Sequence, residues 1–132
     1  MNVLARPLRV LLVEDSKVLT ERVAETLRQT PDVELIGAVD TEDAARDAVW
    51  RDNIDLMILD LHLKQGNGFG VLRGLEGLSD KPEVVVLTNY DLPEYQIAAK
   101  AMGASYFLDK VRDFDKLPEV LQQLVDKSRS KA

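Results

Sequence analysis

Apolar and polar positions along the chain follow two different spacings. Five short stretches are rich in Val, Ile, Leu or aromatic residues, and between them apolar residues recur at every third or fourth position. Short apolar runs are typical of strands, whereas the longer period is typical of amphipathic helices. The pattern predicts strands at 8–14, 33–39, 56–59, 83–88 and 105–109.

Each predicted strand is followed by a predicted helix. Four of these helices have clear apolar stripes, which are Leu19, Val23, Ala24 and Leu27; Ala44, Ala45, Ala48 and Val49; Val71, Leu72, Leu75 and Leu78; and Leu117, Val120, Leu121, Leu124 and Val125. The fourth helix in chain order is expected from Pro93 to about Met102, since Pro suits a first helical turn. Asp40 or Thr41 can cap the second helix. The stretch 65–70, QGNGFG, is expected to be a loop whose glycines serve turns.

Five strands that alternate with five helices predict an α/β fold with a doubly wound parallel sheet. Parallel neighbours require a crossover connection, and the crossover helices cover both faces of the sheet. The strand at 33–39 contains Glu34 and Gly37 and is expected at an edge. The 132 residues suit one domain, with its core at about 8–125 and a frayed helix end at 127–132.

Composition narrows the class of protein. The chain is 45% apolar and 30% charged, as soluble globular proteins are, and its net charge of -6 argues against a nucleic-acid-binding surface. Cys is absent, which excludes disulfides and thiolate chemistry. No apolar run is long enough to span a bilayer, and 1–6 lacks the apolar region of a signal peptide. A cytoplasmic location is therefore expected.

Chemically active side chains stand where the predicted strands end. The first strand ends at Glu14, next to Asp15; Asp60 follows the third strand, Thr88 ends the fourth and Lys110 follows the fifth. The carboxyl ends of parallel strands share one edge of the sheet, where ligands of such folds bind. Carboxylates crowded together repel one another unless a cation joins them, and oxygen ligands with room for water favour Mg²⁺ over Ca²⁺. The sequence predicts a Mg²⁺ site at this edge.

The same set of groups suits phosphoryl transfer. Asp60 would attack phosphorus, while the metal and Lys110 would neutralise the charge on the phosphoryl oxygens. A single aspartate after a strand is ordinarily a solvated turn residue. The other groups expected at the same edge favour the chemical role.

Four short motifs occur in order along the chain. They are VEDS with Glu14 and Asp15, ILDLHLKQGNGFGVL with Asp60, VVVLTN with Thr88, and GASYFLDK with Lys110. Together they resemble the response regulator receiver domain of two-component signal transduction, in particular its single-domain, chemotaxis-regulator-like members. The resemblance covers about 8–125 and implies the flavodoxin-like receiver fold.

The resemblance also implies a phosphoprotein that takes part in a phosphorelay. Asp60 would accept a phosphoryl group from a phosphohistidine on a sensor histidine kinase or a histidine phosphotransfer protein. Asp15 and Asp60 would bind Mg²⁺ directly, Glu14 would act through water, and the backbone carbonyl of His62 would complete the protein ligands. A metal role for the lone His62 side chain is not expected, because it lacks the partners usual in metal sites.

Two further residues would transmit the state of the site. By the same resemblance, Thr88 would follow the phosphate by hydrogen bonding and Lys110 would pair with it, while Phe107 matches the aromatic switch position of the family. Two positions depart from the pattern. Lys64 stands where the loop after the phosphoacceptor usually has proline, and Val111 stands where a cis proline usually follows the lysine.

Two other classes of protein compete with this interpretation. A phosphatase of the haloacid dehalogenase group also forms an aspartyl phosphate with Mg²⁺, but it carries a second Asp two residues after the nucleophile, where this chain has His62. A receiver-like scaffold that is not phosphorylated would be favoured by a missing acid or lysine, and none is missing. The chain is expected to catalyse only its own phosphorylation and dephosphorylation.

The expected output depends on protein partners. Only a short tail follows 125, so a stand-alone receiver without a DNA-binding or catalytic effector domain is expected. It would bind a downstream protein target or a second copy of itself through the fourth helix, fifth strand and last helix, or pass the phosphoryl group onward. It is expected to be a monomer or a phosphorylation-dependent homodimer, and neither nucleic acid nor membrane is an expected partner.

Overall fold

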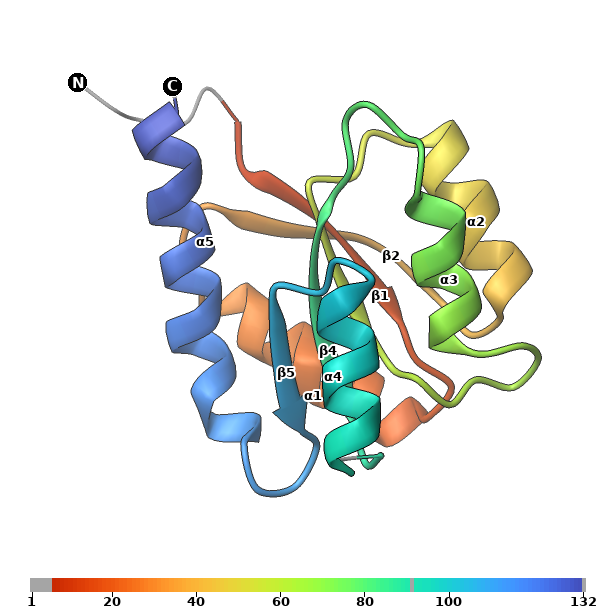
Figure 1. Ribbon diagram of the computed structural model, residues 1–132. Helices are drawn as coiled ribbons and strands as arrows, with labels where there is room; N and C mark the ends of the chain where they lie inside the picture. The colour runs from red at the N-terminus through yellow and green to blue at the C-terminus, as the bar shows by residue number, and fades with distance from the viewer. Residues whose placement is uncertain (1–5, 91, 132) are drawn as a thin grey trace.

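A parallel sheet lies between two layers of helices in the computed structural model, which describes residues 6–90 and 92–131 (Figure 1). The strands are β1 (Leu8–Val13), β2 (Val33–Val39), β3 (Leu56–Leu59), β4 (Glu83–Thr88) and β5 (Tyr106–Asp109), in the spatial order β2-β1-β3-β4-β5. The helices are α1 (Lys17–Arg28), α2 (Glu42–Arg51), α3 (Gly68–Leu75), α4 (Pro93–Ala101) and α5 (Leu117–Lys131), and a 3-10 turn, η1 (Phe114–Lys116), precedes α5. The doubly wound sheet is confirmed, with β2 at an edge.

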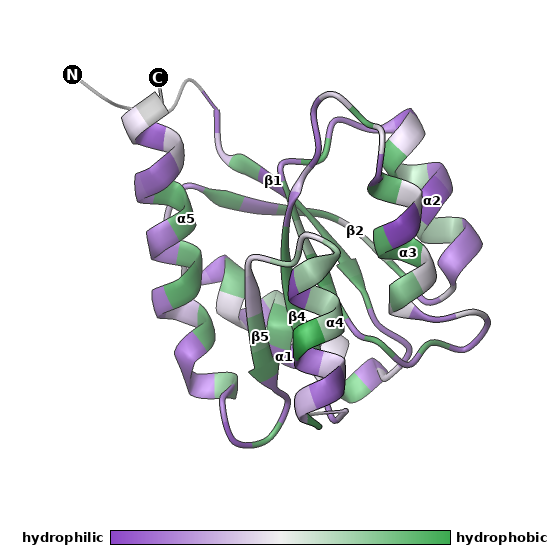
Figure 2. Cartoon of the chain, in the orientation of Figure 1, coloured by the Kyte–Doolittle hydropathy of each residue, from purple (hydrophilic) through white to green (hydrophobic). Residues whose placement is uncertain are grey.

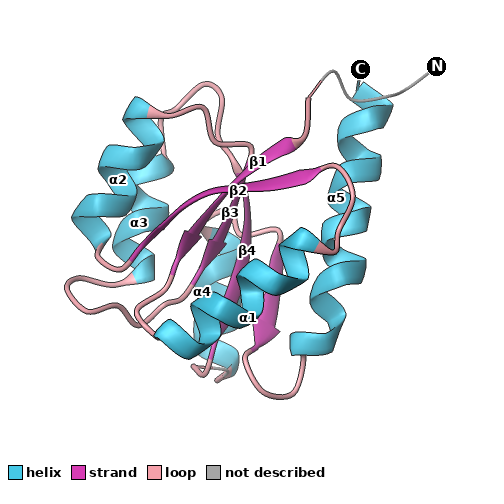
Figure 3. Ribbon diagram, turned by 180° about the vertical axis from the view of Figure 1, so that it is seen from behind, coloured by secondary structure: helices cyan, strands magenta, loops and turns pink. Residues whose placement is uncertain are grey.

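Alternate residues of the central strands supply two apolar cores, one on each face of the sheet. Met57 and Leu59 of β3 pack with α2, α3 and α4, whereas Leu56 and Ile58 pack with α1 and α5. Figure 1 shows α4 in front of the sheet, and Figure 3, seen from behind, shows α1 in front. The strands are mainly green, while green and purple residues alternate along the helices, as expected for helices with one buried face (Figure 2). Because β3 is covered on both faces, its four residues are all buried and its apolar run is continuous.

The strand order places a crevice at the carboxyl ends of β1 and β3. From β1 the chain passes to β2 on one side, and then crosses to β3 on the other side of β1. Helices on the two sides therefore diverge at this point, which is where ligands bind in doubly wound sheets. The topology puts the residues that follow β1 and β3 at a natural binding position.

Three predicted elements are one residue shorter in the structure, namely β1, β5 and α4, and two others differ by more. The third helix begins at Gly68, because the side chain of Asn67 caps it by accepting from the N–H of Gly70 at 2.9 Å. Gly68 and Gly70 are therefore helical rather than turn residues, and the helix ends at Leu75, before Leu78.

The stretch expected to fray, 127–132, is helical as far as Lys131, and Ala132 lies outside the described residues. Two ion pairs tie this end to the body of the protein, Lys127 with Glu83 at 3.0 Å and Arg129 with Asp32. No helix within residues 6–90 and 92–131 is both long enough and apolar enough to pass through a bilayer.

Candidate functional site

Three carboxylates gather at the carboxyl ends of the neighbouring strands β1 and β3. Glu14 and Asp15 leave the end of β1 and Asp60 leaves the end of β3, and each offers an oxygen within 4.8 Å of those of the other two. Glu14 and Asp60 are buried, whereas Asp15 is exposed. The structure therefore brings together the acids that the strand ends predicted, with one side of the group open to solvent.

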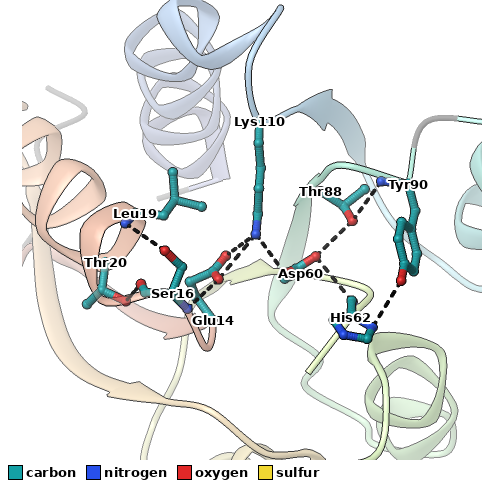
Figure 4. Close-up of polar contacts among 9 residues, drawn as sticks. All are labelled: Glu14, Ser16, Leu19, Thr20, Asp60, His62, Thr88, Tyr90 and Lys110. Carbon is teal, nitrogen blue, oxygen red and sulfur yellow. Dashed lines mark hydrogen bonds and ion pairs between the residues drawn. The ribbon is translucent and has the colours of Figure 1, made fainter. Parts of the chain in front are cut away.

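The carboxylate of Asp60 is held by three donors. Its Oδ1 accepts from the Thr88 hydroxyl at 2.8 Å and from the backbone N–H of His62 at 3.2 Å, and its Oδ2 lies 2.8 Å from Nζ of Lys110 (Figure 4). These donors come from β4, from the loop after β3 and from the end of β5. Because β3, β4 and β5 are neighbours in one sheet, the donors at their ends have fixed positions. The fold therefore sets the orientation of the Asp60 carboxylate.

Lys110 joins the two buried acids. Its Nζ lies 2.9 Å from Oε1 of Glu14 as well as 2.8 Å from Asp60. Burial raises the pKa of Glu14 above its usual value, and the hydrogen bond from Lys110 only partly offsets this effect. Burial by itself would lower the pKa of Lys110, but its hydrogen bonds to Asp60 and Glu14 outweigh burial and raise the pKa. The ammonium is therefore protonated across the physiological range.

The charge of this group suits a divalent cation. When all are ionised, the three carboxylates exceed the single ammonium by two negative charges. The available donors are carboxylate and carbonyl oxygens, and the exposed side at Asp15 leaves room for water ligands. Oxygen donors with several waters are the coordination that Mg²⁺ prefers. The residues present fit the metal that the sequence predicts.

His62 contributes its backbone rather than its ring to the acidic group. Its Nδ1 lies 3.1 Å from the hydroxyl of Tyr90, and the two rings are 5.5 Å apart (Figure 4). Within the described ranges, the ring is absent from the cluster of acids that could hold a metal. His62 and Tyr90 also line a pocket with Asp15, Asp60 and Lys110. The contact between Tyr90 and His62 joins residues 28 positions apart, so it could not be inferred from spacing along the sequence.

Thr88 and Phe107 lie on neighbouring strands beside the acids. Thr88 is fully buried, and its hydroxyl accepts from the N–H of Tyr90 at 3.2 Å while it donates to Asp60. Phe107 is half-buried and packs against the core on the α4 face. In the β4–β5 pairing Phe107 lies opposite Val86, two residues before Thr88. The structure thus brings Thr88 into contact with Asp60, whereas Phe107 lies on the neighbouring strand two register positions earlier.

A side chain braces the loop that carries Lys110. The carboxylate of Asp109 accepts from the N–H groups of Val111 and Arg112, each at 2.8 Å, and the N–H of Asp109 donates to Asp113 at 3.0 Å. No cis peptide occurs among residues 6–90 and 92–131. An aspartate that accepts from N–H groups two and three residues on is an Asx turn, so the DKVR sequence itself contained the signal. Asp109 here braces the loop without the proline usual at position 111.

Comparisons with known proteins show the family and the fold of this chain. A model of the response regulator receiver domain matches residues 10–122. The sensory transduction protein LytT of Bacillus anthracis is 27% identical over 123 residues, which are 93% of this chain and 49% of LytT. This chain therefore spans about half the length of the curated LytT proteins that it matches.

Two solved structures illustrate the likeness. The Mn²⁺-bound form of response regulator Rcp1 is 30% identical, with a TM-score of 0.74 over 89% of this chain and 91% of that one. The response regulatory domain of mrkE from Klebsiella pneumoniae has a TM-score of 0.84 over 95% of this chain and 100% of that one. At 18% identity the second structure supports the fold alone.

Proposed function

Because the chain belongs to the response regulator receiver family, we propose that Asp60 is its phosphoacceptor in two-component signal transduction. Receiver domains interact with histidine kinases or phosphotransfer proteins, and the donor proposed here is a phosphohistidine on such a partner. The observation that carries the proposal is the carboxylate of Asp60, held by Thr88 and Lys110 beside two further acids. A structural turn aspartate needs neither a buried ammonium nor neighbouring carboxylates.

The proposed reaction transfers one phosphoryl group. An oxygen of Asp60 forms a bond to phosphorus as the bond from phosphorus to the donor imidazole nitrogen breaks, and the imidazole retains the electron pair of that bond. Lys110 stabilises negative charge on the phosphoryl oxygens, and the hydroxyl of Thr88 hydrogen-bonds to the phosphoryl group once it is on Asp60. Asp15, Asp60 and the carbonyl of His62 would hold Mg²⁺, with Glu14 acting through water, and the ion would supply further positive charge. The Mn²⁺-bound relative supports a divalent cation in this role.

The proposed chemistry is limited to this site. The residue two positions after the nucleophile is His62, whereas the phosphatase group has a second aspartate there. His62 contacts Tyr90. We therefore expect the domain to catalyse its own phosphorylation and dephosphorylation, and no hydrolysis of other phosphate esters. Its output is proposed to pass through the surface of α4, β5 and α5, next to Phe107, to a protein partner or a second copy.

The metal requirement provides the direct test. Incubation with a small acyl phosphate and Mg²⁺ is expected to add one phosphoryl group, stable in acid and labile in base, which intact mass detects and peptide mapping assigns to Asp60. An excess of chelator should prevent the addition. Labelling that is equal with chelator, or that maps elsewhere, would show that this assignment is wrong.

Thr88→Ala tests the proposed switch. Thr88 is the buried hydroxyl that reaches Asp60, so its loss should leave phosphorylation largely intact while weakening the response of β5 and α4. Amide hydrogen exchange with and without the acyl phosphate measures that response. Thr26→Ala is a matched control, because this hydroxyl only donates within α1, to the carbonyl of Arg22. The same response in Thr88→Ala as in the wild type would exclude Thr88 as the coupling residue.

A further inference from the structure

The glycines after β3 form a socket for one side chain of α2. A Cβ on Gly66 would lie 2.5 Å from Cβ of Glu42, and a Cβ on Gly70 would overlap the Glu42 carboxylate. Gly66 also has a φ of 76°, in the left-handed region that favours glycine. The space that other residues would fill at these two positions is occupied by Glu42, whose side chain is 23% exposed. We call the space between Gly66 and Gly70 the Glu42 socket.

Hydrogen bonds fasten the loop to the start of α2 around this socket. Oε1 of Glu42 accepts from the N–H of Asn67 at 3.2 Å, and the N–H of Glu42 donates to the carbonyl of Gln65 at 3.0 Å. The N–H of Lys64 donates to the carbonyl of Asp40 at 3.2 Å. Side-chain and backbone contacts therefore dock the whole stretch 64–67 onto the β2–α2 connection.

The docked stretch is continuous with the acidic site. Asn67, which Glu42 holds, forms an isolated antiparallel bridge with His62, and Gly68 donates to the carbonyl of Leu61 at 3.0 Å. A Cβ on Gly68 would lie 2.6 Å from the backbone oxygen of Asp60, so this contact also depends on glycine. The position of Glu42 is thereby linked through Asn67 to the backbone of His62, two residues after Asp60.

We propose that Glu42 is a positioning residue for the metal site, an inference that rests on the proposed function. Its side chain in the Glu42 socket holds the loop after Asp60, so that the backbone carbonyl of His62 is kept in place as a ligand. Lys64 gives this loop none of the backbone restraint that a proline would, and the contacts of Glu42 restrain it instead. Groups that orient metal ligands without touching the metal commonly affect its affinity.

Glu42 could instead only stabilise the start of α2, and the experiment must distinguish this role from positioning of the metal ligand. Glu42 is the first residue of α2, where a carboxylate favours the helix dipole, and it pairs with Arg46 at 3.7 Å. Asp43 stands in the same helical turn and is exposed, so Asp43→Ala is a matched control for the dipole effect. A role confined to helix stability would affect both positions alike.

The experiment compares Glu42→Ala, Gly70→Ala and the double variant by calorimetric titration with Mg²⁺. Glu42→Ala is expected to weaken Mg²⁺ binding roughly tenfold, the lower end of the range for residues that orient ligands. Gly70→Ala should do the same, because its methyl group displaces the flexible end of Glu42 from the Glu42 socket. The double variant should be no worse than either single variant, since both remove one interaction. Asp43→Ala should bind Mg²⁺ as the wild type does.

Amide hydrogen exchange of the metal-free proteins gives a second readout. The N–H of Asn67 should exchange faster in Glu42→Ala and in Gly70→Ala, and at the wild-type rate in Asp43→Ala. Wild-type Mg²⁺ affinity in both single variants, or losses that add in the double variant, would overturn the inference about Glu42. Absence of Mg²⁺ binding by the wild type would instead overturn the metal role in the proposed function.

Discussion

Asp60→Asn is expected to accept no phosphoryl group from a small acyl phosphate, whereas the wild type accepts one. An amide is not a nucleophile at neutral pH, and the substitution also removes one of the three acids that could hold Mg²⁺. Asparagine keeps a carbonyl oxygen that can accept from Thr88 and from the N–H of His62, so the loop after β3 should retain its structure. Intact mass after incubation with Mg²⁺ measures the effect, which is the loss of the whole signal.

A control lies on the same strand. Asp55 is at the opposite end of β3, where it pairs with Arg6 at 2.6 Å and accepts from the N–H of Arg9. Asp55→Asn should therefore be phosphorylated as the wild type is. Full labelling of Asp60→Asn, or equal loss of labelling in both variants, would contradict the assignment of Asp60.

Lys110→Met is expected to lower the free energy of unfolding by about 3 kcal/mol at neutral pH in metal-free protein, the lower end of the range for breaking a buried ion pair. The substitution leaves Glu14 and Asp60 facing each other without the ammonium that now lies within 2.9 Å of both. We use the lower end of the range for buried ion pairs because the site opens to solvent at Asp15, so the two carboxylates are only partly shielded from water. Mg²⁺ should restore part of the loss by replacing the missing positive charge. Denaturant unfolding with and without Mg²⁺ measures both effects.

The loss in Lys110→Met should depend on pH through Glu14. Burial already raises the pKa of Glu14 above 4.5, and Lys110 opposes that rise, so the variant should raise it further. A carboxyl group with a higher pKa in the folded state than in the unfolded state keeps its proton longer in the folded state. The free energy of unfolding therefore falls as pH rises from the unfolded-state pKa to the folded-state pKa. The pKa of Lys110 is raised above 10.5, so its own contribution is complete at neutral pH. The deficit should therefore be larger at neutral pH than at about pH 4, where Glu14 is protonated and only the pair of Lys110 with Asp60 is lost.

A surface lysine supplies the comparison for Lys110. Lys116 pairs with Asp113 at 3.3 Å, but its side chain is 63% exposed. Exposed pairs of this kind contribute about 0–1 kcal/mol. A deficit in Lys110→Met no larger than that of Lys116→Met, or one that is the same at neutral and acidic pH, would show that the buried pairs with Glu14 and Asp60 do not stabilise the fold.

Local pattern predicted the elements whose burial is uniform along their length. The continuous run at 56–59 is buried on both faces of the sheet, and the more polar stretch at 33–39 is the edge strand. The start of α3 was placed too late because the prediction followed the apolar stripe from Val71. The cap at Asn67 begins the helix three residues earlier, and its residue type was already a signal for a helix start.

The sequence by itself determined the sheet, the edge at which its polar residues meet and the kind of chemistry they suit, because strand ends follow from periodicity and parallel strands share their carboxyl edge. Only the tertiary structure decided how those residues contact one another. Lys110 reaches Glu14 across a separation of 96 residues, and Glu42 fills the Glu42 socket 25 residues before Asn67. Such contacts depend on how whole helices and strands pack and on the side-chain conformations that this packing permits. The spacing of apolar residues along the chain indicates only which nearby residues are buried and whether they form a helix or a strand.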